Sequence, residues 1–316
     1  MLKALADAVR SAPGVLGKRD LPIVRRLAGD GDDAALVEHG GEFLVVCGEA
    51  ISPPFLEADP FGAGGAAVVT NVSDVRAMGG RPLAIVDMLV SPDREHAATV
   101  LDGIEWAADL LGVPVVGGHL TIGHPPALSA SCTGIAARPL RGAAAVPGDV
   151  LLAAFALDGR YMSDVQPFFT ALHDRAPELL RTDGEALVEV AERGLCHAAR
   201  DVSMPGVAGS LLQMIEGAGC GATLDLDRLP RPPGADLERW LLTFPSFGFL
   251  LAARPEHVEA ACEAFTRRGL ACAPCGAFDD TRVLRLSAGG AEAPAWDLAR
   301  APLTGLGPAG SPSAGA

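Results

Sequence analysis

Residues 59–82 read DPFGAGGAAVVTNVSDVRAMGGRP, and this stretch decides the fold. Asp59 followed by Pro60 is typical of a helix N-terminus, because Asp caps free N–H groups and proline fits the first helical position. Apolar residues then recur at helical spacing, and Gly79 is the kind of residue that ends a helix. The stretch therefore predicts one long helix that begins near residue 59 and ends near residue 79.

Two polar residues interrupt the apolar stripe of this helix. Asp74 comes one turn after Asn71, on the polar border of the stripe. A lone carboxylate there is either solvated or directed at a ligand, and solvation is the commoner outcome, because charged residues are rarely buried unpaired. The small residues at 62–67 loosely match a dinucleotide-binding fingerprint, but no strand leads into them. We interpret them as small residues that let the helix pack closely.

Strands and helices alternate along the whole chain. Apolar runs predict strands at 43–47, 83–90, 113–116, 127–136, 150–157, 222–226, 247–253 and 283–287. Helices are predicted after Ser91-Pro92 up to Gly112, and at 184–193, 205–217 and 255–268. This alternation predicts a two-domain fold of the α/β or α+β class.

A turn in the middle of the chain separates the two halves. Pro147-Gly148-Asp149 is a turn sequence, and a new apolar strand starts directly after it. We therefore predict an N-terminal domain at 1–149 and a C-terminal domain at 150–302. Residues 303–316 are rich in Gly, Pro, Ser and Ala, which is typical of a disordered tail.

The composition argues against several classes of protein. A formal charge of −14 over 316 residues disfavours a large nucleic-acid or anionic-membrane surface, since both need clustered Lys and Arg. No run of 18 apolar residues occurs, and the N-terminus lacks the apolar core of a secretory signal. Seven scattered cysteines, an odd number, favour free thiols in a reducing cytoplasm. We expect a cytoplasmic protein.

Several carboxylates stand where they can bind a cation. Gly31-Asp32-Asp33 is either a surface turn or a loop that offers two oxygen ligands to Mg²⁺. Glu49 follows the strand at 43–47 and can add a third carboxylate at the same end of the sheet. Asp201 precedes the helix at 205–217, where it is either an N-terminal cap or a metal ligand from the second domain.

Two other patterns have weaker claims to function. Cys272-Ala-Pro-Cys275 has redox spacing, but it has no second pair of cysteines for a zinc site and lies between a helix and a Gly turn. His119 and His124 flank a loop, and no further zinc ligands can be nominated around them. A redox or metal role is therefore not expected for the cysteines, and we interpret the histidines as ordinary loop residues.

The order of these segments resembles that of selenophosphate synthetase. GDDAALVEHGGEFLVV (31–46), CGEAISPP (47–54), the stretch 59–82 and VVGGHLTIGHPPALSASCTGIA (115–136) follow one another as in its nucleotide-binding half. ARDVSMPGVAGSLLQM (199–214) resembles its second-domain Asp-Val-Thr-Gly segment. Thiamine-monophosphate kinase is a more distant resemblance, sharing Gly-Asp-Asp and the Ser-Asp helix. The chain is thus identified as similar, over roughly 29–290, to the superfamily of aminoimidazole-ribonucleotide (AIR) synthetase and selenophosphate synthetase.

The resemblance implies a PurM-like fold and a set of site residues. It implies an N-terminal domain whose sheet pairs with a second subunit to form a homodimer, and a C-terminal α/β domain, with ATP and Mg²⁺ held by the two. Asp32 or Asp33, Asp74 and Asp201 fall at metal-ligand positions, and Glu49 stands where the family has Asp. Asn71, Gly117, Gly118 and His119 are expected at the nucleotide, the last three as a Gly-Gly-His loop near the phosphates.

The chain also departs from selenophosphate synthetase. The reactive Cys and nearby Lys of its Gly-rich N-terminal segment have no clear counterpart, and the earliest cysteine, Cys47, is already inside a strand. Lys18 is the only lysine that can fill the Lys role. The second-domain Thr-Ser-Gly-Gly signature has become Pro245-Ser246-Phe247-Gly248, and Thr-Gly after the second-domain Asp has become Ser203-Met204. Selenide chemistry is therefore not expected.

These observations favour ATP-dependent phosphoryl transfer to a small molecule, with Lys18 and His119 as candidate catalytic residues. Such catalysis is mainly positioning and charge neutralisation, which clustered carboxylates with Mg²⁺ supply. Two alternatives remain at this point. One is a nucleotide-binding or structural homodimer that has lost catalysis, and the other is a small-molecule kinase resembling thiamine-monophosphate kinase.

Overall fold

The computed structural model describes residues 1–24, 31–162 and 168–307, and they form two compact units. Unit 1 comprises Met1–Asp33, Leu140–Asp174 and Glu189–Ala316, and unit 2 comprises Ala34–Pro139 and Arg175–Val188. The predicted boundary turn lies inside unit 1, because Gly148 N–H donates to Phe278 O (2.9 Å) and Phe278 N–H donates to Asp149 O (2.9 Å). These bonds tie the turn to a strand near the C-terminus.

Unit 2 is built on a five-stranded mixed sheet in the order β1-β2-β5-β3-β4. Only β3 and β4 run parallel, and the other neighbours are antiparallel. The strands are β1 (Ala35–His39), β2 (Glu42–Ala50), β3 (Arg81–Ser91), β4 (Val115–Ile122) and β5 (Ala127–Ala136). The helices are α3 (Pro53–Ala58), α4 (Pro60–Ala77), α5 (Arg94–Leu111) and α6 (Pro177–Thr182), and α7 (Glu185–Glu192) begins in this unit.

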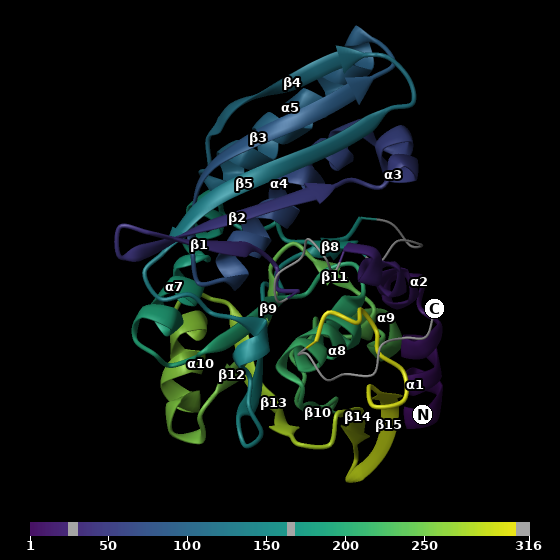
Figure 1. The fold of residues 1–316 in the computed structure, drawn as a ribbon, viewed down its shortest axis with the longest axis vertical. Coiled ribbons are helices and arrows are strands. Elements are labelled where there is room, and N and C mark those ends of the chain that lie inside the picture. The colour runs from purple at the N-terminus through teal and green to yellow at the C-terminus, as the bar shows by residue number, and fades with distance from the viewer. Residues whose placement is uncertain (25–30, 163–167, 308–316) are drawn as a thin grey trace. The chain divides into compact units, whose positions relative to one another are not determined.

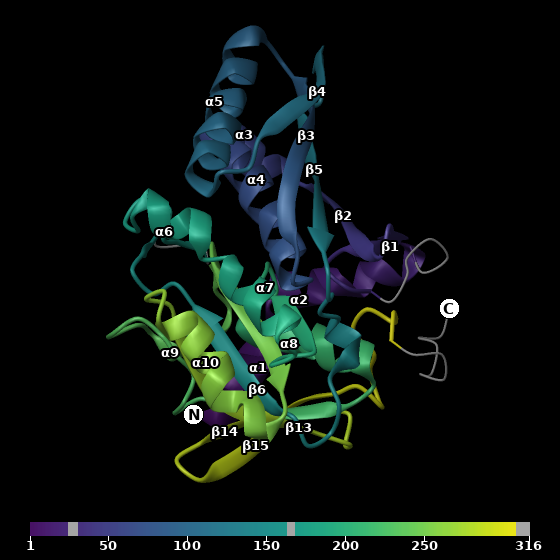
Figure 2. The same cartoon turned by 90° about the vertical axis from the view of Figure 1, so that its left-hand side faces the viewer.

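The two long helices cover one face of this sheet, as the edge-on view in Figure 2 shows. The predicted start of α4 is confirmed, because the Asp59 side chain accepts a hydrogen bond from Gly62 N–H and Pro60 is its first residue. Gly64 supports the packing interpretation of the small residues. A Cβ there would lie 2.1 Å from Val100 O on α5, so only glycine allows this close approach.

Unit 1 contains a seven-stranded sheet in the order β15-β14-β10-β13-β6-β12-β9, and a small sheet in the order β11-β8-β7 (Figure 1). Its strands are β6 (Val150–Phe155), β7 (Arg160–Tyr161), β8 (Phe168–Thr170), β9 (Ala198–Asp201), β10 (Gly221–Asp225), β11 (Phe244–Pro245), β12 (Gly248–Ala253), β13 (Ala271–Asp279), β14 (Val283–Ala288) and β15 (Ala291–Asp297). Its helices are α1 (Leu2–Ser11), α2 (Pro13–Leu16), α8 (Gly206–Ala218), α9 (Leu237–Leu241) and α10 (Val258–Thr266), with short 3₁₀ turns η1 (Gly17–Val24), η2 (Gly142–Ala144) and η3 (Pro255–His257).

The core of unit 1 explains why its central strands are wholly apolar. Leu151 and Phe155 of β6 belong to one buried cluster with Leu211 of α8, and Trp240 lies in the same cluster. Leu152 of β6 is also fully buried, although alternate residues of a strand point to opposite faces. Both faces of β6 are therefore covered, with α10 among the elements packed against it.

The C-terminal segment differs from the prediction of a tail that is disordered from residue 303. Leu303 and Thr304 are buried, and their N–H groups each donate to the Glu216 carboxylate of α8 at 2.7 Å. The Thr304 hydroxyl and the Gly305 N–H donate to the same carboxylate. The prediction was wrong for residues 303–307, because a buried acid of α8 binds the backbone of 303–305 and the Leu306 N–H donates to the Thr304 hydroxyl. Residues 308–316 lie outside the described part of the chain.

No helix among the described residues is long and apolar enough to cross a membrane.

Candidate metal and nucleotide site

Two of the predicted metal ligands, Asp33 and Asp201, meet in unit 1. The Asp201 N–H donates to Asp33 Oδ2 at 3.0 Å, although 168 residues separate them in sequence. Asp33 Oδ1 lies 3.2 Å from the Arg200 guanidinium, in an ion pair whose two side chains are almost fully buried. Asp32 Oδ1 accepts from Gly142 N–H at 2.8 Å, so each Asp of the pair is fixed by a different element.

Local backbone geometry directs these carboxylates. Gly31 has φ +73°, a left-handed conformation that glycine adopts at little cost, and it turns the chain just before the Asp pair. Its carbonyl accepts from Arg200 Nη1 at 3.2 Å, which fixes the loop to β9. Asp201 is the last residue of β9, a fully buried strand that pairs with β12. The end of β9 thus positions the Asp201 carboxylate and the turn at Gly31 positions that of Asp33, and the two lie close together in unit 1.

Asp74 lies in unit 2, on the buried part of α4. The sequence favoured a solvated Asp at this position, but the side chain is 6% exposed. One turn earlier, Asn71 is fully buried, and its amide donates to Ala67 O at 2.8 Å. The Cys47 thiol of β2 lies 3.4 Å from Asn71 Oδ1, so α4 and β2 are in direct polar contact here.

The Asp74 carboxylate raises the pKa of two thiols in the sheet of unit 2. Burial and, to a smaller extent, the Asp74 carboxylate together raise the pKa of Cys132 to about 12. Burial raises the pKa of Cys47, and the nearby carboxylates of Asp74 and Glu49 add to this effect. Glu49 is two residues from Cys47 on β2, so both side chains point to the face that α4 covers. Unit 2 therefore brings Asp74 and Glu49 to one side of its sheet.

The predicted Gly-Gly-His loop is a strand. Gly117, Gly118 and His119 lie in β4, which pairs with β3 and places His119 beside Met88. Met88 alternates with the buried residues of β3 and points away from the helices, so His119 shares the face opposite to α4. The loop prediction was wrong because parallel pairing with β3 extends the strand through both glycines.

Asp87 is a candidate site residue that was not predicted from the sequence. It is the register partner of Gly118 and is 7% exposed on the helix-covered face of β3. A Cβ at Gly118 would lie 2.1 Å from Asp87 Oδ1, so the glycine makes room for this carboxylate. Burial raises the pKa of Asp87. The available signal was a single acid within the apolar run LAIVDMLV (83–90).

Lys18, the candidate catalytic lysine, is half-buried in η1 of unit 1. Within the described residues it makes no hydrogen bond or ion pair with the carboxylates of this unit. The structure therefore does not assign it a contact in the candidate site.

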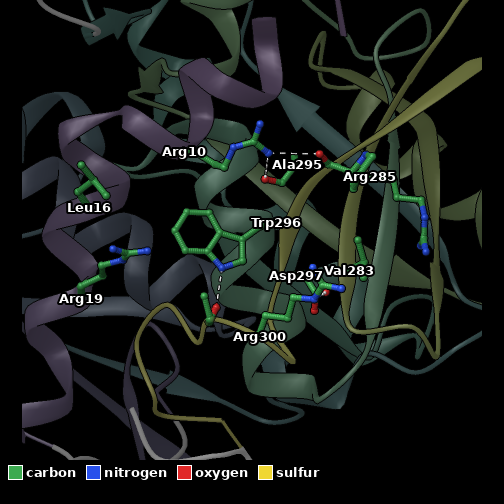
Figure 3. Close-up of a pocket in the computed structure, with 11 residues that line it drawn as sticks. Arg10, Leu16, Arg19, Val283, Arg285, Ala295, Trp296, Asp297 and Arg300 are labelled. Atoms are coloured by element: carbon green, nitrogen blue, oxygen red, sulfur yellow. Dashed lines mark hydrogen bonds and ion pairs between the residues drawn. The ribbon is translucent and has the colours of Figure 1, made fainter. Parts of the chain in front are cut away.

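A pocket of about 610 Å³ lies on another part of unit 1, between the N-terminal helices and β15 (Figure 3). Its arginines contact the protein itself. Arg10 donates to Ala295 O at 2.8 Å, Arg19 lies over the Trp296 ring at 5.1 Å, and Arg300 pairs with a neighbouring Asp at 3.2 Å. The pocket contains none of the predicted site residues. We interpret Arg10 and Arg19 as contacts that hold α1 and η1 to β15, whereas Arg300 pairs within its own turn.

Comparison with known proteins places these residues in a family. Residues 31–136 match the model of the AIR synthase related protein, N-terminal domain, and residues 161–288 match that of the C-terminal domain. An uncharacterized protein of Synechocystis sp. is 35% identical over 97% of this chain and 99% of its own length. The chain belongs to the AIR synthase-related family. A selenide, water dikinase of Myxococcus xanthus is 33% identical over 63% of this chain and 59% of its own length.

Solved structures confirm the two-domain PurM-like fold. T. maritima PurL complexed with ATP matches with a TM-score of 0.72 and 23% identity, over 83% of this chain and 45% of that chain. The AIR synthase-related chain thus spans slightly less than half of that PurL. At this identity the likeness shows the fold alone.

Proposed function

We propose that this AIR synthase-related protein is an ATP- and Mg²⁺-dependent phosphoryl transferase that acts on a small molecule. The observation that carries the proposal is the proximity of two carboxylates in unit 1, since oxygens of Asp33 and Asp201 lie within 4.8 Å of each other. Two buried acids from distant parts of the sequence are costly to bring together unless something compensates their charge. The Arg200 guanidinium pairs with Asp33, and a divalent cation that binds both carboxylates would offset their mutual repulsion further.

The proposed metal ligands are Asp33 and Asp201 from unit 1 and Asp74 from unit 2, with Asp32 and Glu49 as further candidates. Carboxylate oxygens fit Mg²⁺, a hard cation that proteins hold through one or two carboxylates together with phosphate oxygens. When bound, Mg²⁺ neutralises the charge that develops on the transferred phosphoryl group. The chain's own part is to position and direct these acids, as Arg200 and the Asp201 N–H do for Asp33.

The proposal also includes nucleotide contacts in unit 2. Asn71, Gly117 and Gly118 are the proposed contacts, and the ATP complex of T. maritima PurL supports a nucleotide in this fold. Lys18 and His119 are the candidates for proton transfer and phosphate contact. The position of His119 on the face opposite to α4 separates it from Asp74 within unit 2.

A homodimer through the sheet of unit 2 is part of the proposal. The sheet face away from α4 and α5 exposes Val46 and Val86 (38% each) and Met88 (45%). Apolar side chains that gather on one open sheet face mark an interaction surface. A second copy of the same sheet would bury this face, as the family resemblance implies.

The test is ADP formation from ATP in the presence of candidate acceptors with hydroxyl, phosphate, amide or carbonyl groups. We expect Mg²⁺-dependent ADP formation that rises with one acceptor class and is lost in Asp201→Asn. No ADP formation with any acceptor, in protein that binds nucleotide, would refute the transferase and leave a binding function.

One observation favours that second candidate, a nucleotide-binding protein without catalysis. Ser246 lies in the altered second-domain signature, and both its backbone and its side chain form hydrogen bonds that stabilise the fold. Its N–H donates to Phe169 O at 2.8 Å, and its hydroxyl accepts from Ala171 N–H at 3.0 Å. A segment that in selenophosphate synthetase carries a Gly-rich signature here holds β11 to β8 instead. A small-molecule kinase remains the outcome if only hydroxyl or phosphate acceptors support ADP formation.

A further inference from the structure

Two cysteines of unit 1 come into sulfur–sulfur contact. Cys262 lies on α10 and Cys272 lies near the start of β13, and their Sγ atoms are 3.7 Å apart. Both side chains are half-buried, whereas the other five cysteines of the chain are buried. The two thiols of this pair therefore contact each other and are also accessible to a dissolved reagent.

The partner of Cys272 is not the cysteine that the sequence spacing indicates. Cys275 is fully buried and belongs to the core cluster around α8. A register shift in β13 lies between Pro274 and Gly276, so the two cysteines are separated by an irregular stretch of strand. Cys272 instead contacts α10, across the turn that joins this helix to the strand.

The two thiols differ in reactivity. The Cys272 thiol donates a hydrogen bond to the sulfur of Cys262, and this bond lowers the pKa of Cys262. The same bond and burial raise the pKa of Cys272. Because the thiolate is the nucleophilic form, Cys262 is the residue that reacts first with an oxidant.

A metal ion does not account for the pair. No third thiol, imidazole or carboxylate of the described residues joins these two sulfurs at metal-binding spacing. A structural zinc site needs four protein ligands and a catalytic one usually three. The remaining chemistry open to two adjacent thiols is reaction with each other.

We propose that Cys262 and Cys272 form a reversible dithiol–disulfide pair that is oxidised by a peroxide. The Cys262 thiolate attacks one oxygen of hydrogen peroxide, which gives a sulfenic acid and releases hydroxide. The Cys272 thiol then displaces the sulfenic oxygen as water and forms the sulfur–sulfur bond. In sum, two thiols and one hydrogen peroxide give one disulfide and two waters, and a dithiol reductant reverses the change.

The geometry needs little rearrangement. A disulfide bond is about 2.05 Å long, so the two sulfurs must approach by roughly 1.6 Å. Cys262 lies in the middle of α10 and Cys272 near the start of β13, and one short turn, with Gly269 at φ +74°, connects these two elements. Rotation of the two side chains therefore supplies most of the approach.

Peptide mapping of the full-length protein tests the proposal. Purified reduced protein is treated with hydrogen peroxide, denatured, alkylated with iodoacetamide and digested with trypsin. Cys262 falls in the peptide 240–267, and Cys272 and Cys275 share the peptide 269–282. We expect the two peptides to appear joined, with Cys275 alkylated, and dithiothreitol to release them.

Three variants sharpen the result. Cys262→Ser and Cys272→Ser each keep the size of the side chain and should abolish the joined peptide, with circular dichroism showing an unchanged fold. Cys275→Ala should still give the joined peptide. The proposal is overturned if both thiols of the oxidised wild-type protein are alkylated, or if the peptide 269–282 carries an internal disulfide.

Discussion

Three buried carboxylates show how differently single acidic residues are stabilised in this chain. Glu216 accepts from the backbone of the C-terminal segment, Asp33 is paired with Arg200, and Asp87 lies buried beside Gly118. The sequence could indicate Asp33, since adjacent acids after a glycine form a pattern. It could not indicate Asp87 or the role of Glu216, because their environments come from segments distant in the sequence.

Asp87→Asn should stabilise the protein at neutral pH. Burial raises the folded-state pKa of Asp87 above its ordinary value of 3.8. The folded protein is therefore penalised as pH rises through that raised pKa, and the penalty is absent below pH 3.8, where both states hold the proton. Denaturant unfolding as a function of pH measures this. The gain should shrink as pH falls, and a gain that does not change with pH would contradict the assignment.

At the scale of elements, local signals predicted helix ends better than strand extent. Asp59 caps the start of α4 and Gly112 caps the end of α5, as the sequence predicted, because a cap acts on the nearest turn of backbone. β4 runs to Ile122, whereas the sequence ended the strand at residue 116. The extension depends on pairing with β3, since the two glycines at 117 and 118 give no local preference for a strand.

Glu216→Ala should release the segment 303–307 from α8. The carboxylate accepts from the N–H groups of Leu303, Thr304 and Gly305 and from the Thr304 hydroxyl, and bonds to charged acceptors are among the stronger ones. We expect a loss of about 2 kcal/mol in the free energy of unfolding. Limited proteolysis should cut near residue 303 sooner than in the wild-type protein. Equal cleavage rates would show that the carboxylate does not hold the segment.

Arg10→Ala should weaken the attachment of α1 to β15. The guanidinium donates to Ala295 O across 285 residues of sequence, so its loss should cost about 1–2 kcal/mol. Arg300→Ala removes a neighbouring arginine that is 87% exposed and pairs only within its own turn, and it should cost no more than about 0.5 kcal/mol. Urea unfolding of both variants gives the comparison. Equal losses would contradict the bracing role of Arg10.

At the scale of the whole molecule, the alternation of strands and helices was enough to predict two units, but it could not predict which segments each contains. Residues 1–24 and 31–33 pack in unit 1 with the C-terminal half, and residues 175–188 pack in unit 2. Contacts such as that of Arg10 with β15 join opposite ends of the chain, and no local sequence pattern indicates them. The carboxylates of the candidate site are divided in the same way, with Asp33 and Asp201 in unit 1 and Asp74 in unit 2.

Met88→Lys should weaken self-association through the sheet of unit 2. A charge on this exposed apolar face would have to be desolvated when a second copy covers it. Leu101→Lys is the matched control, since Leu101 is similarly exposed (39%) on α5, away from that face. Analytical ultracentrifugation should show a dimer for the wild-type protein and the control, and more monomer for Met88→Lys. A monomeric wild-type protein would contradict the proposed dimer.

The most direct test of the central claim is calorimetric titration with a non-hydrolysable ATP analogue, with and without Mg²⁺. We predict binding that needs Mg²⁺ and weakens at least about tenfold in both Asp74→Asn and Asp201→Asn, since even outer partners of metal sites are worth about 10–100-fold. Asp102→Asn, an exposed acid on α5, should bind like the wild-type protein. Unchanged affinity in the first two variants, or affinity that is indifferent to Mg²⁺, would contradict the carboxylate site.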